Sequence, residues 1–115
     1  MLVAFSVWPN GGPGGDSLHD AVAAAVRIVR ASGLPNRTDS MFTTIEGEWD
    51  EVFDVIHRAA DAVATYGPRV DLMIKADIRP GHAHELDGKV ERLEKALAAQ
   101  EEAARLRIEP VTPAV

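Results

Sequence analysis

The sequence predicts an α+β domain, a ferredoxin-like βαββαβ sandwich with an extra C-terminal helix. Short apolar or alternating stretches, typical of strands, are separated by stretches whose apolar residues recur at helical spacing. Their order is β-α-β-β-α-β, and two helices of similar length between paired strands are typical of this sandwich. In that fold the strands lie in the order 4-1-3-2, and the helices cover one face of the sheet.

The chain should begin with a buried strand, a loop and a helix. Residues 2–8, LVAFSVW, are apolar almost throughout and predict the strand, while residues 9–15, PNGGPGG, predict the loop. A helix should then start at Asp16 or Ser17, either of which can cap it, and should stop at Gly33, which is followed by Leu-Pro. The apolar stripe expected on this helix consists of Leu18, Val22, Ala25, Val26 and Val29.

Two strands and a second helix are expected in the middle of the chain. Residues 36–41 are polar and alternate like an edge strand, and residues 42–47 form a better strand. The connection between them could be a tight turn or a bulged continuous ribbon. The second helix should run from about residue 49 to residue 66. Its buried stripe is Val52, Val55, Ile56, Ala59 and Val63.

The fourth strand has the cleanest alternation, in residues 69–78, and the last helix should span about 86–105. We expect residues 1–105 to form a single domain and residues 106–115 to form a loose tail. The strand residues expected to face the helices are Val3, Phe5, Val7, Ile45, Val70, Leu72 and Ile74. The opposite face should display Ala4, Ser6, Trp8, Thr44, Glu46, Met73, Lys75 and Asp77.

A two-layer sandwich leaves one face of its sheet uncovered. Trp8 and Met73 should lie on that face, and large apolar side chains are seldom left in water as a patch. We therefore expect a homo-oligomer in which another copy covers the sheet.

Composition restricts the partners and the chemistry. Twelve Lys and Arg against 18 Asp and Glu give a net charge of −6, which disfavours nucleic acid and is compatible with a small cationic ligand. The absence of cysteine excludes disulfides, thiolate metal sites and thiol catalysis. The first residues lack a basic region, and no stretch approaches the ~20 apolar residues of a membrane span. We expect a cytoplasmic protein with no membrane partner.

The segment TTIEGEWDEV, residues 43–52, places two carboxylates and a tryptophan at a strand-to-helix joint. Glu48 suits the positive end of a helix, and Trp49 could pack over the first turn, so both have structural explanations. Glu46 is less easily explained, because glutamate is depleted in central strands and needs a partner when buried. That partner could be Lys75 on the same face or a ligand with hydrogen-bond donors.

Two other motifs give weak signals. The loop NGGPGG lacks both the Lys-Ser/Thr ending of a phosphate loop and the spacing of a dinucleotide fingerprint. The run HAHE, from His82 to Glu85, offers no third metal ligand at a clear spacing. We therefore expect no metal and no catalytic residue.

Three segments, MLVAFSV, SGLPNRTDSMFTTIEGEWDEV and IKADIRPG, resemble the small thiamine-binding protein family of ferredoxin-like domains, over roughly residues 1–98. The resemblance implies a cytoplasmic protein that assembles into dimers or tetramers through its sheets. It also implies a noncatalytic site for thiamine or its hydroxymethylpyrimidine portion, so thiamine would be a ligand rather than a cofactor. This chain departs from the family at Trp8-Pro9 and the following glycines, where a short Pro-Leu-Gly turn is usual.

The resemblance also suggests a site on the open face of the sheet. Thiamine combines an aminopyrimidine, which suits a carboxylate such as Glu46, with a flat cation, which suits an aromatic ring such as Trp49 or Trp8. The residues expected to complete the hydrogen bonding on the same face are Ser6, Thr43, Thr44 and Asp77. Two alternatives stay open: an enzyme of the dimeric α+β barrel type, and a structural domain that only oligomerises.

Overall fold

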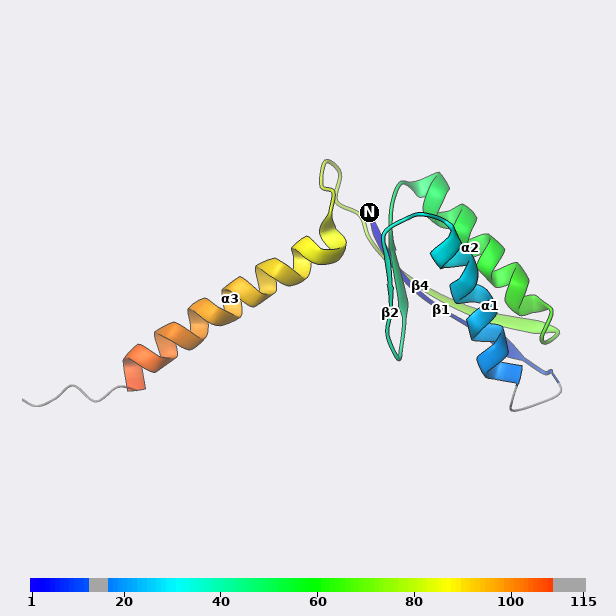
Figure 1. The fold of residues 1–115 in the computed structure, drawn as a ribbon, viewed down its shortest axis with the longest axis horizontal. Helices are drawn as coiled ribbons and strands as arrows, with labels where there is room; N and C mark the ends of the chain where they lie inside the picture. Colours follow the sequence, from blue (N-terminus) through cyan, green and yellow to red (C-terminus); the bar gives the residue numbers. More distant parts are fainter. Residues whose placement is uncertain (13–16, 109–115) are drawn as a thin grey trace, which may run out of the picture.

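The computed structural model describes residues 1–12 and 17–108. Its elements are β1 (Leu2–Asn10), α1 (Ser17–Ala31), β2 (Asn36–Thr38), β3 (Thr43–Glu46), α2 (Trp49–Ala64), β4 (Arg69–Asp77) and α3 (Glu85–Ile108). Figure 1 shows α1 and α2 on one side of the sheet and α3 projecting away from it. The expected cap at Asp16, part of the glycine-rich loop and the tail from residue 109 lie outside the described residues.

The four strands form one antiparallel sheet in the order β2-β3-β1-β4, which confirms the predicted sandwich. β1 is central and places Val3 opposite Ile45 of β3 and opposite Ala76 of β4. It also runs further than predicted, to Asn10, along β4. Because β3 pairs with β1 only as far as Phe5, the end of β1 has a free edge, where Pro9 needs no ladder donor.

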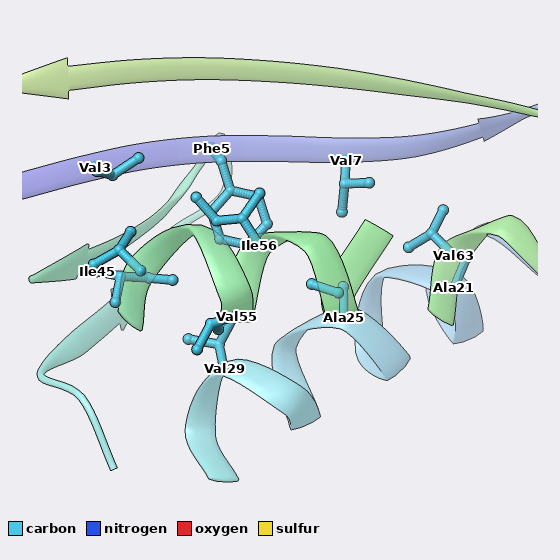
Figure 2. Packing of buried hydrophobic residues seen from close by; sticks show 12 residues of the cluster. Val3, Phe5, Val7, Ala21, Ala25, Val29, Ile45, Val55, Ile56 and Val63 are labelled. Atoms are coloured by element: carbon cyan, nitrogen blue, oxygen red, sulfur yellow. The ribbon is translucent and has the colours of Figure 1, made fainter. Parts of the chain in front are cut away.

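The core lies between the sheet and the two helices that cover it (Figure 2). The five residues predicted for α2 are all buried. The stripe on α1 is rotated from the predicted one, because Ala21 is fully buried while Leu18, Val22 and Val26 are half-buried. The other buried apolar residues are Val3, Phe5, Val7, Ala25, Val29 and Ile45.

β4 departs from the prediction in its burial. Leu72 and Ile74 lie on the helix-covered face, directly opposite Val7 and Phe5, as expected. They nevertheless remain 42% and 39% exposed, so the expectation that they pack against the helices is wrong. The reason is that β4 is an edge strand, and the two helices contact the interior strand β1 more extensively than β4. Only Val70, near the start of β4, packs partly buried against the core.

The connection between β2 and β3 is a tight turn rather than a bulged ribbon. The backbone nitrogen of Asp39 donates to the carbonyl of Phe42 at 2.9 Å, which closes the turn. β2 and β3 then pair from Thr38 opposite Thr43. β2 is therefore shorter than predicted, since residues 39–41 belong to the turn.

α3 is longer than predicted and contacts the rest of the molecule only through its first turns (Figure 1). It extends to Ile108, so the first three residues of the expected loose tail are helical. Its apolar residues Val90, Leu93 and Leu97 stay 46%, 56% and 41% exposed. Within residues 1–12 and 17–108, no helix combines the length and apolar character needed to cross a bilayer.

Candidate functional site

Glu46 is the last residue of β3 and is only 7% exposed. Its Oε2 accepts a hydrogen bond from the backbone nitrogen of Glu85 at 2.7 Å, and its Oε1 accepts one from that of Leu86 at 3.1 Å. The first N–H groups of a helix lack partners within the helix, and its positive end favours an anion. The partner of this buried carboxylate is therefore the amino end of α3, and Lys75 makes no hydrogen bond to it among the described residues.

Two ion pairs hold the same end of α3 against the sheet. Lys89 Nζ lies 2.6 Å from Asp77 Oδ2, and Arg37 Nη2 lies 2.5 Å from Asp87 Oδ1. The hydrogen bond from Lys89 holds the pKa of Asp77 below its ordinary value. Asp77 is therefore placed on the open face as predicted, but it is engaged with α3.

A pocket of about 240 Å³ lies beneath the first turns of α3. Thr44, half-buried on the open face, lines it together with Leu2 and Lys89. Of the predicted residues on this face, Thr44, Glu46 and Asp77 thus gather around α3. The cluster is polar and largely occupied by contacts within the chain.

Trp49 is the first residue of α2 and does not join that cluster. Its ring is 53% exposed and stacks on Phe53, with 5.2 Å between the ring centroids. Trp49 lines a pocket that includes Arg79 and His82 but not Glu46. The expected corner built from Glu46 and Trp49 is therefore not formed, because Glu46 turns beneath α3 while Trp49 stays on the outside of α2.

The remaining predicted residues, Ser6, Trp8 and Thr43, line a different pocket, of about 280 Å³. It lies between α1, the free edge of β1 and the β2–β3 turn, and most of its lining is apolar. Leu18 and Val22 of α1 belong to that lining, which explains why they are only half-buried.

The structure corrects the predicted face of Thr43. It lies directly opposite Phe5, so it shares the helix-covered face rather than the face of Ser6 and Thr44. Thr43 is 7% exposed, and its Oγ1 lies 3.1 Å from Oγ1 of Thr38. Both faces still contribute to the pocket, because β3 ends there and leaves the edge of β1 open.

Asp39 is a candidate that the sequence reasoning missed. Its Oδ1 accepts hydrogen bonds from the backbone nitrogens of Phe42 at 2.9 Å and Met41 at 2.8 Å, and these two bonds lower the pKa of the Asp39 carboxyl. No described residue hydrogen-bonds to its Oδ2. Asp39 lines both the pocket at the β1 edge and the pocket beneath α3. The available signal was an aspartate between two strands, a residue that commonly bonds its own turn.

The loop before α3 contains two histidines, His82 and His84. His82 Nδ1 lies 3.8 Å from Glu85 Oε1, and Glu85 is bound more closely by Arg92, whose hydrogen bond lowers the pKa of Glu85. In the part of the chain that the structure describes, no group of three His, Asp or Glu side chains is arranged to hold a metal ion.

Comparison with known proteins gives consistent matches. Residues 3–94 match the sequence profile of a family described as thiamine-binding protein. The chain is 49% identical over 102 residues to UPF0045 protein Mb1933 of Mycobacterium bovis, covering 88% of this chain and 98% of that protein.

Solved structures show the same fold. A hypothetical protein, MJ1052, from Methanocaldococcus jannascii superposes with a TM-score of 0.72 at 25% identity, over 81% of this chain and 94% of that one. A domain of unknown function, DUF77, from Bacillus cereus gives a TM-score of 0.69 at 33% identity, over 77% and 85%.

Proposed function

The chain belongs to the thiamine-binding protein family, and from this premise we propose that it binds thiamine or its hydroxymethylpyrimidine portion. The binding is noncatalytic and serves sensing, storage or delivery of the vitamin. The family match supports a thiamine-related role, and the features below support the choice of ligand and of site.

The observation that carries the proposal is the pocket at the free edge of β1, where Trp8 and Asp39 come together. Trp8 is 46% exposed, and a flat cationic ring can stack on its indole. Asp39 supplies a carboxylate that its own turn already orients, and Oδ2 can accept from the amino group or protonated ring of the pyrimidine. Ser6 and Thr43 add hydroxyl groups to the lining.

The size of this pocket favours a compact ring. Its volume of about 280 Å³ lies at the low end of small-molecule sites, which typically measure ~300–1,000 Å³. A pyrimidine ring with short substituents suits such a space. The thiazolium and its hydroxyethyl tail would then extend toward the rim of the pocket. The pocket beneath α3 begins on that side, because Asp39 lines both pockets.

Glu46 is a second candidate for the aminopyrimidine, because its hydrogen-bond partners Glu85 and Leu86 line the pocket beneath α3. Each of its oxygens accepts one backbone hydrogen bond and has a further lone pair. A ligand beside Thr44 would share this carboxylate with α3, and Asp77 would have to leave Lys89 to take part. The pocket at the β1 edge needs no such exchange, so we favour it.

An enzyme of the α+β barrel type would hold a buried histidine or aspartate between the sheet and the helices. Among the described residues that layer contains apolar side chains and Thr43. The composition of this layer favours binding over catalysis.

We further propose that the protein works as a homodimer or homotetramer whose copies meet through the sheet. Trp8 and Met73 are 46% and 61% exposed on the open face. Met73 lies directly opposite Ser6, which is two residues before Trp8 on β1, so the two large side chains are diagonal neighbours. Covering this face would remove an apolar surface from water.

Isothermal titration calorimetry with thiamine, its phosphates and hydroxymethylpyrimidine tests the proposed ligand. We expect saturable heat with at least one of them, and Trp8→Ala should abolish it or weaken it strongly. Trp49→Ala is the matched control, since it removes the other indole, and it should leave the affinity unchanged. Loss of binding in Trp49→Ala alone would move the site to the start of α2. The absence of heat with every ligand on folded protein would refute the proposal.

A further inference from the structure

Arg79, in the loop after β4, is a cation without an ion-pair partner among the described residues. It lines a pocket of about 250 Å³ together with His82 and Trp49. A smaller pocket of about 50 Å³ is also lined by Arg79 and His82. The two pockets therefore adjoin at these two residues, and neither shares a lining residue with the pocket at the β1 edge.

A tight turn brings Arg79 and His82 close together. The backbone nitrogen of His82 donates a hydrogen bond to the carbonyl of Arg79 at 3.2 Å. Pro80 and Gly81 occupy the two central positions of the turn, and Gly81 has a φ of 78°. Proline at the first central position and glycine at positive φ at the second are typical of a type II turn. The sequence Arg-Pro-Gly-His thus places a guanidinium and an imidazole at the two ends of one turn.

The acidic side chains of the smaller pocket already have partners within the chain. Glu85 is bound by Arg92, with 3.3 Å between its Oε1 and Nη1 of Arg92. Asp77 is bound by Lys89. Each acidic group of this lining is therefore neutralised, and the charge of Arg79 is left without compensation. A concave surface with excess positive charge favours an anion.

Trp49 gives the larger pocket an aromatic surface. Its indole is 53% exposed and is held in place by Phe53, with an angle of 16° between the two ring planes. A planar ring of a ligand can stack on the exposed part of this indole. Glu48, the acidic residue of this lining, forms a capping box with Glu51 at the start of α2, so it too has a partner within the chain.

We propose that these adjoining pockets bind the phosphate monoester of a neutral planar heterocycle, of the kind that a purine nucleoside monophosphate presents. Arg79 and His82 hold the phosphate, and Trp49 stacks on the ring. The fork of an arginine fits two phosphate oxygens, and a second nearby donor suits a doubly charged phosphate. The site is separate from the pocket at the β1 edge, so the proposal does not rest on thiamine binding.

The same charges select against a cationic ring. Thiamine monophosphate also carries a phosphate, but its positively charged thiazolium would lie close to Arg79, and like charges at short range repel each other. A neutral purine has no such penalty. The net charge of −6 disfavours a nucleic-acid polymer, so the occupant is a single nucleotide.

Isothermal titration calorimetry with adenosine monophosphate (AMP), adenosine and inorganic phosphate tests the ligand. AMP should bind about tenfold or more tightly than either of the other two, because adenosine lacks the phosphate and inorganic phosphate lacks the ring. An equal concentration of thiamine monophosphate should leave AMP bound. The absence of saturable heat with millimolar AMP on folded protein, or equal affinity for AMP and either fragment, would overturn the proposal. Displacement of AMP by thiamine monophosphate would overturn the selection of a neutral ring.

Substitution of Arg79 tests the phosphate contact. Arg79→Ala should weaken AMP binding by about tenfold or more, and Arg79→Lys should retain part of the affinity, because lysine keeps the charge but not the fork. Arg69→Ala is the matched control, since Arg69 also lacks an ion-pair partner among the described residues but lies at the other end of β4. Arg79→Ala should leave thiamine affinity and the melting temperature unchanged. Equal AMP affinities in Arg79→Ala and Arg69→Ala would contradict the assignment.

Tryptophan fluorescence tests the stacking contact. The chain has two tryptophans, so Trp8→Phe leaves Trp49 as the only indole. AMP should change the emission of Trp49 with the dissociation constant that calorimetry gives, because the adenine lies against the indole. Saturation of the calorimetric signal without a change in this emission would place the ring elsewhere and would contradict the proposed site.

Discussion

The carboxylate of Glu46 is bound to the backbone of Glu85, with 2.7 Å between Oε2 and the amide nitrogen. This contact joins the end of β3 to the start of α3 across 39 positions of the sequence. It gives a structural reason for a glutamate in a central strand, since the carboxylate satisfies helix N–H groups that otherwise lack partners. Any role of Glu46 in ligand binding must coexist with this one.

Glu46→Gln should loosen the amino end of α3. The glutamine side chain keeps one acceptor but turns an NH₂ group toward a backbone donor, so one hydrogen bond to a charged group is lost at a cost of ~1–3 kcal/mol. Hydrogen exchange should show faster exchange of the Glu85 and Leu86 amides. Glu48→Gln is the matched control, because Glu48 is exposed and should leave that exchange unchanged.

The same variant separates the two roles of Glu46. If the carboxylate also binds the aminopyrimidine, thiamine affinity should fall on the order of ten- to a hundredfold. Unchanged exchange at α3 together with reduced affinity would assign Glu46 to the ligand, whereas unchanged affinity with faster exchange would assign it to α3 alone.

Asp39→Asn should reduce the affinity for thiamine by about tenfold or more, because it replaces an ionised acceptor with a neutral one. The asparagine oxygen can still accept from the turn, so the melting temperature should change little. Titration calorimetry and thermal unfolding measure the two effects. Asp50→Asn removes an exposed carboxylate from α2 and serves as the control. Equal affinities in both variants would remove Asp39 from the site.

Docking of α3 should weaken in acid through Asp77. Lys89 lowers the pKa of Asp77 in the folded protein below its ordinary value of 3.8. A lowered folded-state pKa stabilises the contact above the ordinary value, and that stabilisation is lost as the pH falls through the folded-state pKa. NMR resonances of the first turns of α3 should report this loss below pH 3.8. Asp77→Asn should remove the Asp77 contribution, and an identical acid response in the variant would show that other groups cause it.

Met73→Glu should weaken assembly. Met73 lies on the open face, so a contact between sheets would bury the introduced carboxylate without a partner at a cost of several kcal/mol. Light scattering should show a lower mass at equal concentration. A wild-type protein that stays at the monomer mass of 12.4 kDa at micromolar concentration would refute oligomerisation.

Local patterns in the sequence determined the order of the elements and most of the core. Every residue predicted for the buried stripe of α2 is buried, because a helix with one apolar face removes that face from water by packing it against the sheet. Strand alternation likewise assigned Phe5 and Ile45 to the helix-covered face. The middle motif and its flanking segments also indicated the family that the profile match shows.

Only the tertiary structure decided which partners the polar groups have. The partner of Glu46 is a helix end 39 residues away. This contact leaves no periodic signal, because it depends on how distant segments come together. The face of Thr43, by contrast, follows from strand alternation, because Thr43 lies two residues before Ile45. The exposure of Leu72 also depends on the tertiary structure, since alternation specifies the face of a strand residue but not how much of an edge strand the helices cover.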